Sequence, residues 1–341
     1  MNAIGLNRWS GLIAGVALAL TVAMPAARAE VKEISISKGY GILYLPLIVM
    51  EDQKFLEKEA QKAGLGDVKV KWVLLDGGNV INDAMMAGTL NFAGTGAPGF
   101  ITLWSKARGI PNVEVVGISA LSATSLYLNT NNPNIKSLAD FKSTDKIALP
   151  GIKTSLSAVV LQMLAAKQFG LENFAKLDPI TVSLPHPEAL AALTSGKTEV
   201  TAHFTSPPFS YLELADPHIH RVVNSVEVIG NLTMDVVYAP RKFVDANPKM
   251  AEAMVAALDA ADEFIRTRKA DAAEIFSRTS KTKVSKEEIL KILDDPDTQF
   301  ATTPSKIMNF VEFMHRAGTI KVAPAKWSDM FISQLAGRSG S

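Results

Sequence analysis

The chain has 341 residues, no cysteine and nearly balanced charge, with 35 Lys and Arg against 34 Asp and Glu. This balance argues against a nucleic-acid partner or an anionic membrane surface, and the lack of cysteine excludes disulfides, thiolate metal ligands and a cysteine nucleophile. An apolar content of 48% is enough for a sizeable core, and the length is enough for two lobes.

The first 29 residues have the pattern of a secretory signal peptide. The cationic Arg8 precedes an apolar run over residues 12–24, and the small-x-small tripeptide Ala27-Arg28-Ala29 follows. A membrane anchor is the alternative, but this run is shorter than the roughly 18 to 20 continuous apolar residues of a membrane span. We therefore expect cleavage after Ala29 and export to a bacterial periplasm.

Strand-like runs alternate with helical segments through much of the mature chain. The β-rich runs lie at residues 31–37, 68–74, 90–93, 113–119, 125–129, 146–149, 180–183, 200–203 and 221–223. Helical segments between them include residues 45–63, 80–87, 156–169 and 188–194. Beyond Pro240 strand signals stop, and helices are predicted over residues 249–268, 270–278, 286–293 and 304–316.

The alternation predicts an α/β fold with two lobes, each a mainly parallel sheet flanked by helices. No linker rich in Gly, Pro or Ser divides the chain, so we expect the backbone to cross between the lobes twice, at residues 117–127 and 225–238. After the signal peptide, residues 30–120 plus 235–341 are then a discontinuous first lobe, and residues 121–234 are the second. The helical C-terminal tail would complete the first lobe.

Four loops at predicted strand ends are rich in glycine and hydroxyl side chains. They cover residues 38–42, 76–79, 94–99 and 150–155. Ligands of open α/β sheets sit at the carboxyl ends of strands, and free N–H groups at helix starts form an anion site there. Each loop alone is equally explained as a helix cap or a tight turn. Four of them meeting at one cleft favour a ligand site.

Two histidines follow later strands, His186 at the start of a predicted helix and His203 at a strand end. They are either donors to an anionic ligand or satisfied polar groups at strand ends, and the sequence leaves both open. No GxSxG elbow, HExxH pair or phosphate-binding GxxxxGK[ST] loop is present. We therefore predict no catalytic residues, no metal site and no cofactor.

Three segments resemble those of periplasmic solute-binding proteins of the nitrate/taurine/aliphatic-sulfonate (NitT/TauT) family, the receptors of ABC importers. LNFAGTGAP at residues 90–98 is similar to a glycine-rich stretch of that family. IKSLADFK at residues 135–142, followed by KIALP, is similar to its "iksLaDLkGKkIavp" segment, and EALAALTSG at residues 188–196 to its "aAL-x-sG" passage. The order and spacing hold over residues 31–240.

The resemblance implies a type II-like periplasmic-binding-protein fold with two crossover segments, closing by a hinge on a small solute. It also implies an ABC permease in the inner membrane as partner, and we expect a monomer. By position, the predicted ligand-binding residues are Gly39, Tyr40, Asn79, Thr95, Gly96 and Ala97 from the first lobe, and Lys153, Thr154, Ser155, His186, His203 and Thr205 from the second.

The function predicted on this basis is capture of a small anionic solute, such as a sulfonate, a carboxylate or a nitrate-like oxyanion, for import. A neutral or cationic nitrogenous solute is the alternative if Asp76, Glu188 or Asp235 faces the cleft. Thiamin-precursor synthases share the fold, but they rely on a cysteine-containing motif, which this chain lacks. A third possibility is a solute receptor for a membrane sensor.

Overall fold

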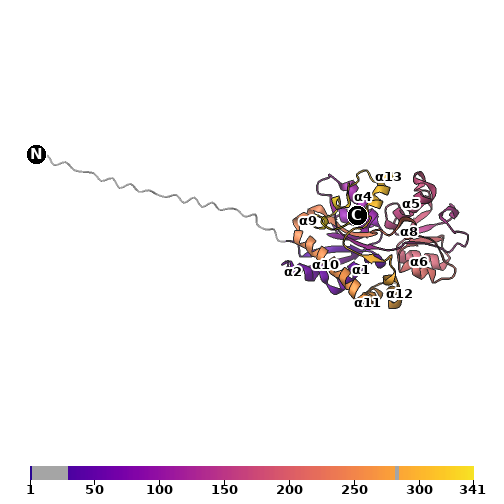
Figure 1. Cartoon of the computed structure of the whole chain (residues 1–341), viewed down its shortest axis with the longest axis horizontal. Helices are drawn as coiled ribbons and strands as arrows, with labels where there is room; N and C mark the ends of the chain where they lie inside the picture. Colours follow the sequence, from indigo (N-terminus) through magenta and orange to yellow (C-terminus); the bar gives the residue numbers. More distant parts are fainter. Residues whose placement is uncertain (2–29, 281–283) are drawn as a thin grey trace.

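Two β-sheets, each flanked by helices, organise the chain (Figure 1). The computed structural model describes residue 1, residues 30–280 and residues 284–341, so the predicted cleavage site and apolar run lie outside the described residues. Sheet A has the strand order β11-β4-β10-β3-β1-β2, and sheet B the order β7-β6-β8-β5-β9.

The strands of sheet A are β1 (Glu33–Lys38), β2 (Lys69–Leu74), β3 (Phe92–Gly96), β4 (Val115–Ala123), β10 (Asp235–Pro240) and β11 (Gln299–Phe300). Those of sheet B are β5 (Tyr127–Thr130), β6 (Ile147–Leu149), β7 (Thr181–Ser183), β8 (Ala202–Thr205) and β9 (His220–Asn224). Each of the strands predicted from the sequence begins within two residues of one of β1 to β9.

The helices fall into two groups according to the sheet that they flank, and the group around sheet B lies at the right of Figure 1. Around sheet A lie α1 (Leu45–Gln53), α2 (Phe55–Lys62), α3 (Gly78–Met86), α4 (Ala97–Ala107), α9 (Arg241–Ala246), α10 (Pro248–Thr267), α11 (Lys269–Thr279), α12 (Lys286–Asp294) and α13 (Met308–Arg316). Around sheet B lie α5 (Leu156–Phe169), α6 (His186–Ser195), α7 (Phe209–Leu214) and α8 (Ser225–Ile229).

Both sheets are mixed, which corrects the prediction of mainly parallel sheets. In sheet A, β1 pairs in parallel with β2 and β3, but β10 is antiparallel to β3 and β4. In sheet B, β6 pairs in parallel with β7 and β8, but β5 is antiparallel to β8 and β9. In sheet A the antiparallel pairing follows from the path of the backbone between the sheets. The chain leaves sheet A at the end of β4 and re-enters it along β10, so these two neighbouring strands run in opposite directions.

The backbone passes between the sheets in two short segments. Residues 124–126 join β4 to β5, and residues 230–234 join α8 to β10. After β10 the chain forms α9 to α13, and α10 packs against α1, α2 and β4 of sheet A. The tail is not wholly helical as predicted, because β11 pairs with β4 at the edge of sheet A.

Two helices differ from the sequence prediction for local reasons. The helix predicted over residues 45–63 is divided at Lys54, whose left-handed backbone (φ 53°) ends α1 and starts α2. Helix α4 follows the glycine-rich loop at residues 94–99, where a helix start is expected, but the sequence prediction gave it no bounds; ten of its eleven residues are buried. By contrast, α5 has the predicted bounds, with Ser155 as its N-cap and Gly170 at its C-terminus.

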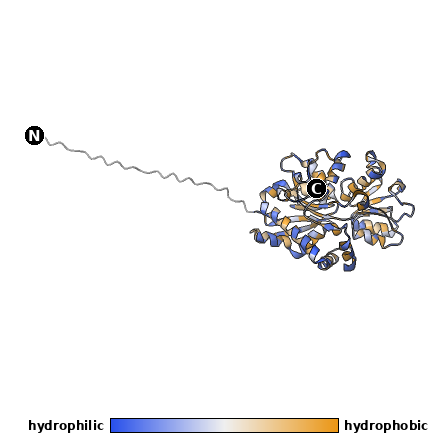
Figure 2. Cartoon of the chain, viewed as in Figure 1, coloured by the Kyte–Doolittle hydropathy of each residue, from blue (hydrophilic) through white to orange (hydrophobic). Residues whose placement is uncertain are grey.

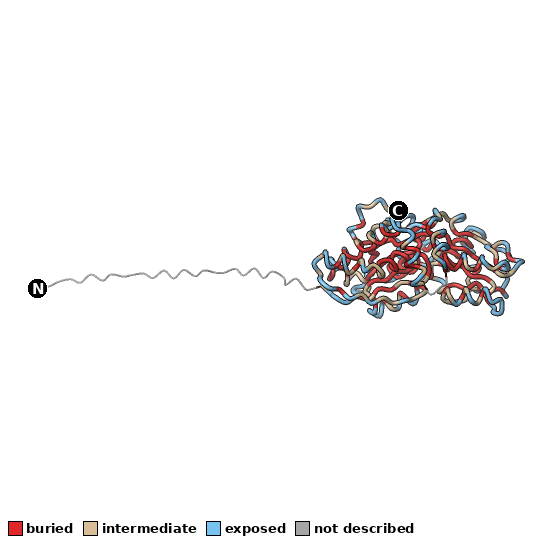
Figure 3. Tube along the Cα trace, turned by 90° about the horizontal axis from the view of Figure 1, so that it is seen from below, coloured by how far each residue is buried: buried red, intermediate tan, exposed pale blue. Residues whose placement is uncertain are grey.

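Buried residues run through the interior of the molecule, and exposed residues lie mostly at its outside (Figure 3), where hydrophilic residues are common (Figure 2). The main core is continuous from the strands of sheet A to Leu128 and Phe204 of sheet B. A smaller cluster around Leu193 packs under α6. Within the described residues, no helix has both the length and the apolar composition of a membrane span.

Candidate ligand site between the two sheets

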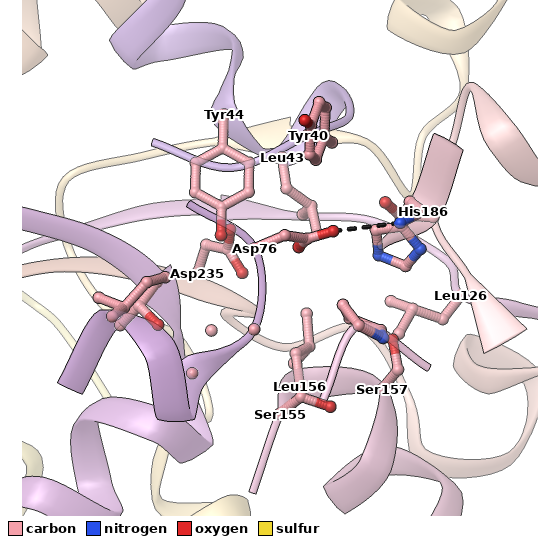
Figure 4. A pocket seen from close by; sticks show the side chains of 17 residues that line it. Tyr40, Leu43, Tyr44, Asp76, Leu126, Ser155, Leu156, Ser157, His186 and Asp235 are labelled. Atoms are coloured by element: carbon pink, nitrogen blue, oxygen red, sulfur yellow. Dashed lines mark hydrogen bonds between the residues drawn. The ribbon is translucent and has the colours of Figure 1, made fainter. Parts of the chain in front are cut away.

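A small cavity of about 40 Å³ lies where loops from the two sheets meet, with room for only a few water molecules (Figure 4). The loops after β1, β2 and β3 and the start of β10 form one wall, and the starts of α5 and α6 form the other. The lining residues are Tyr40, Leu43, Tyr44, Asp76, Gly77, Gly78, Ile81, Thr95, Gly96, Leu126, Pro150, Ser155, Leu156, Ser157, His186, Ser206 and Asp235.

Hydrogen bonds join the two walls directly. The backbone N–H of His186 donates to Asp76 Oδ2 at 3.1 Å, and the N–H of Ile42 donates to the carbonyl of Pro207 at 2.9 Å. The Thr154 hydroxyl donates to Asn79 Oδ1. The walls also approach closely at Gly77, where an added Cβ would lie 2.6 Å from the Pro150 carbonyl oxygen. The structure is therefore a closed arrangement.

Two carboxyl groups dominate the charge of the cavity. Asp235 is 1% exposed, and burial raises its pKa to about 7, with the nearby Asp76 carboxylate adding to the shift and a hydrogen bond from Tyr44 opposing it. Burial also raises the pKa of Asp76 to about 6, opposed by hydrogen bonds from the N–H groups of His186 and Gly77. Of the lining residues, none is a lysine or an arginine.

These carboxyl groups make the stability of the protein depend on pH. Their pKa values, about 6 and about 7, lie above the value of about 3.9 in an unfolded chain, so the folded protein holds extra protons between these limits. The stabilisation is complete below pH 4 and is lost as the pH rises through 7. We expect the melting temperature to fall by about 5 °C between pH 5 and pH 8.

Calorimetry of the wild type and Asp235→Asn at both pH values checks this expectation. Asp262 in α10 acts in the same direction, because burial raises its pKa to about 8. The quantity to compare is therefore the fall in melting temperature between pH 5 and pH 8, which should be smaller in Asp235→Asn than in the wild type. An equal change of melting temperature in both would contradict the assignment to Asp235.

A buried chain of hydrogen bonds leads from sheet B to the cavity. His203 Nδ1 lies 2.5 Å from Glu213 Oε1, and both side chains are fully buried. His203 Nε2 lies 2.8 Å from His186 Nδ1, which also lies 3.0 Å from the Thr205 hydroxyl. Asn129 Nδ2 donates to the other oxygen of Glu213 at 2.8 Å. His186 is the member of this network that reaches the cavity, and burial holds its pKa well below the usual value.

The twelve predicted ligand-binding residues divide into two sets. Those that line the cavity are Tyr40, Thr95, Gly96, Ser155 and His186, and those that do not are Gly39, Asn79, Ala97, Lys153, Thr154, His203 and Thr205. Asn79 and Thr154 bond each other across the rim, while His203 and Thr205 lie behind His186. Lys153 is exposed and has a left-handed backbone (φ 68°).

Ser155 already has local partners, because its hydroxyl accepts from the N–H of Ala158 and donates to the Gly151 carbonyl. Gly39 packs against Tyr44 instead, since a Cβ there would lie 2.6 Å from the Tyr44 ring. Ala97 is the first residue of α4 and is buried.

The sequence prediction missed several residues that line the cavity, above all Tyr44 and the pair Asp76 and Asp235. Asp76 begins the loop after a predicted strand, and its carboxylate was considered as a ligand group only under the alternative of a cationic solute, as was that of Asp235. A signal for Asp235 does exist: it is a lone carboxylate at the start of the apolar run Val236-Val237-Tyr238 inside a predicted crossing segment. Tyr44 sits in an apolar segment that is typical of a core.

Comparisons with known proteins assign the chain to a family. A family model described as "NMT1/THI5 like" matches residues 61–272, more than half of the chain. No curated protein sequence matches significantly.

Several solved structures are similar. The alkanesulfonate-binding protein SsuA from Xanthomonas axonopodis pv. citri, bound to MOPS, is 15% identical over 86% of this chain and 96% of its own, with a TM-score of 0.66. The periplasmic nitrate-binding protein NrtA from Synechocystis PCC 6803 is 16% identical over 88% and 84%, with a TM-score of 0.67.

A Candida albicans protein described as having the generic periplasmic binding protein fold is 14% identical over 86% of this chain and 92% of its own, with a TM-score of 0.63. Because these sequence identities are low, the similarity to solved structures shows the fold alone. Together with the family match, it shows that the chain belongs to the NMT1/THI5-like family and has the two-sheet fold of the periplasmic solute-binding proteins.

Proposed function

We propose that the protein is the substrate-binding component of an ABC importer, which captures a small solute by closing two lobes over it. The observation that supports this most is the cavity itself: its wall comes from both sheets, and hydrogen bonds across the rim enclose it. A solute that touches both walls binds the closed form more tightly than the open form, so it shifts the population toward closure.

The proposed lobes are residues 30–120 plus 235–341 and residues 121–234. Sheet membership supports this division, because the strands of sheet A and of sheet B fall almost wholly within these ranges. The short crossing segments at residues 124–126 and 230–234 are the proposed hinge. The similarity to the alkanesulfonate-binding protein SsuA and to the periplasmic nitrate-binding protein NrtA supports a periplasmic location and a membrane permease as partner.

We propose further that the protein is not an enzyme. The synthases that share the fold are expected to need a cysteine-containing motif, and the chain has no cysteine. Delivery to a membrane sensor in place of a permease stays an alternative that the same binding chemistry supports. The sequence predicts an anionic solute, and anions are one of the classes of solute that the binding test compares.

A ligand screen tests the function. The purified protein is heated with sulfonates, carboxylates, inorganic oxyanions, nitrogen heterocycles and small organic cations. A solute present at 100 times its dissociation constant adds about 2.7 kcal/mol of stability, which raises the melting temperature by several degrees. We expect one chemical class to do so and to lower the radius of gyration in X-ray scattering. The absence of both effects for every class would overturn the proposal.

A further inference from the structure

The cavity has unsatisfied hydrogen-bonding groups as well as charge. Asp235 Oδ2 and Thr95 Oγ1 are buried, and neither has a hydrogen-bond partner. Both residues line the cavity, so their free atoms are available to an occupant. A buried carboxylate oxygen accepts hydrogen bonds and cannot donate them, and leaving it unpaired is costly. A ligand that donates N–H groups removes that cost.

Several N–H groups at the helix starts around the cavity already have acceptors within the protein. At α4, the N–H of Ala97 already donates to the Met234 carbonyl at 2.7 Å, and Pro98 has no N–H. At α5, the N–H of Ala158 donates to Ser155 Oγ. At α6, the N–H of His186 donates to Asp76 Oδ2. Each of these donors has a protein acceptor in the closed form.

The histidine at the cavity wall adds no positive charge. Burial holds the pKa of His186 well below its usual value, so the ring is neutral near pH 7. Its Nδ1 lies 2.8 Å from His203 Nε2 and 3.0 Å from the Thr205 hydroxyl, which leaves Nε2 as the ring nitrogen available to an occupant.

We infer that the solute held between the two sheets is a small organic cation rich in N–H donors, such as an amidinium, guanidinium or ammonium compound, bound by Asp235 and Asp76 with Thr95 as a further partner. This inference rests on the proposed solute-binding function and names the class of solute. A cation neutralises two carboxylates that otherwise repel each other in a cavity whose lining residues include no lysine or arginine. An anion would add a further negative charge there.

Isosteric pairs of opposite charge test this inference directly. Guanidinium and nitrate are planar and of similar size, as are acetamidinium and acetate, but the cations donate hydrogen bonds and the anions accept them. Isothermal titration calorimetry at pH 8, up to about 20 mM of each probe, compares the members of each pair. We expect binding of the two cations and no binding of the two anions.

Substitutions then locate the site. We expect Asp235→Asn to weaken guanidinium binding at least about tenfold, because it removes a buried charge partner of the ligand. The matched control is Asp262→Asn, which removes another buried carboxyl group from α10, away from the cavity, and should leave the affinity unchanged. Guanidinium binding that survives Asp235→Asn, or that is lost equally in Asp262→Asn, would overturn the site.

The wild type provides a test that does not depend on any variant folding. Guanidinium keeps its charge throughout the range, so its affinity should rise at least about threefold between pH 5.5 and pH 8 as Asp235 and Asp76 ionise. The groups that face Asp235 here are Tyr44, which hydrogen bonds to it, and Asp76, with His186 beside Asp76. An affinity that stays constant or falls with rising pH contradicts the inference.

The outcomes separate this inference from the proposed function. If nitrate or acetate binds and closes the protein while the cations do not, the solute class is wrong and the binding function stands. If none of the four probes binds, the inference is wrong for solutes of this size. The proposed function is then decided by the wider screen of solutes and by X-ray scattering.

Discussion

Gly96→Ala is expected to lower the affinity for solute at least about tenfold while leaving the melting temperature of the ligand-free protein within about 2 °C of the wild type. Gly96 ends β3 on the sheet A side of the cavity, and its backbone (φ −57°, ψ 135°) suits any residue. An added Cβ would lie 2.7 Å from Cβ of Leu156, at the start of α5. The new methyl group is therefore strained only when the two walls meet.

A second substitution separates this steric effect from a lost ligand contact. Leu156→Gly removes the atom that the new methyl group would touch, and the remaining distances of 3.3 and 3.4 Å to the Leu156 backbone are tight but tolerable. We expect the double variant to recover most of the affinity. Gly151→Ala is the matched control, because its Cβ would make ordinary contacts of 3.5 Å or more, one of them across the rim with Gly77.

Titration calorimetry with the solute that gives the largest melting shift measures the affinities, and X-ray scattering measures closure. The single variant should keep the larger radius of gyration of the open form at solute concentrations that close the wild type. Normal closure of Gly96→Ala would show that the contact between Gly96 and Leu156 does not form in the bound state.

The sequence was informative where a residue's environment is set by its neighbours along the chain. Strands β1 to β9 alternate with helices in the predicted order, and the capping of α5 by Ser155 is a local signal that placed that helix correctly. It was uninformative where burial is uniform. Helix α4 is almost wholly buried and received no bounds, and β10 lies in an apolar segment that was interpreted only as a crossing.

The candidate site also depends on contacts that neighbours along the chain do not determine. Loop composition correctly indicated which loops meet, but the polar groups of those loops partly satisfy one another on closure, as Asn79 and Thr154 do. The charge of the cavity depends on Asp76 and Asp235, which come from distant parts of the chain and meet only because β10 returns beside β3. No local pattern in the sequence indicates that these two residues lie together. The prediction of an anion therefore rests on the glycine-rich loops, on Lys153 and the histidines, and on the family resemblance.

His203→Leu is expected to reduce the free energy of unfolding by about 3 kcal/mol or more. The substitution removes the hydrogen-bond partner of Glu213, whose side chain is fully buried and keeps only Asn129 at its other oxygen. It also removes one of the two partners of His186 Nδ1 and leaves the Thr205 hydroxyl as the other. Chemical denaturation monitored by tryptophan fluorescence measures the loss, and the change in midpoint gives its size.

His218→Leu is the matched control for this prediction. Its side chain is 88% exposed and pairs with Asp216, so the same substitution should change the stability by no more than about 0.5 kcal/mol. Similar losses in the two variants would mean that the buried network contributes nothing particular to stability.

The double variant His203→Leu/Glu213→Leu identifies the unpaired carboxylate as the cause. Removing both partners also removes the buried charge, so we expect the double variant to be more stable than His203→Leu alone, with a coupling of roughly 1 to 3 kcal/mol between the two sites. A double variant less stable than the single one would attribute the loss to packing instead. If stability recovers while solute affinity does not, the network's role is to hold His186 in position at the cavity.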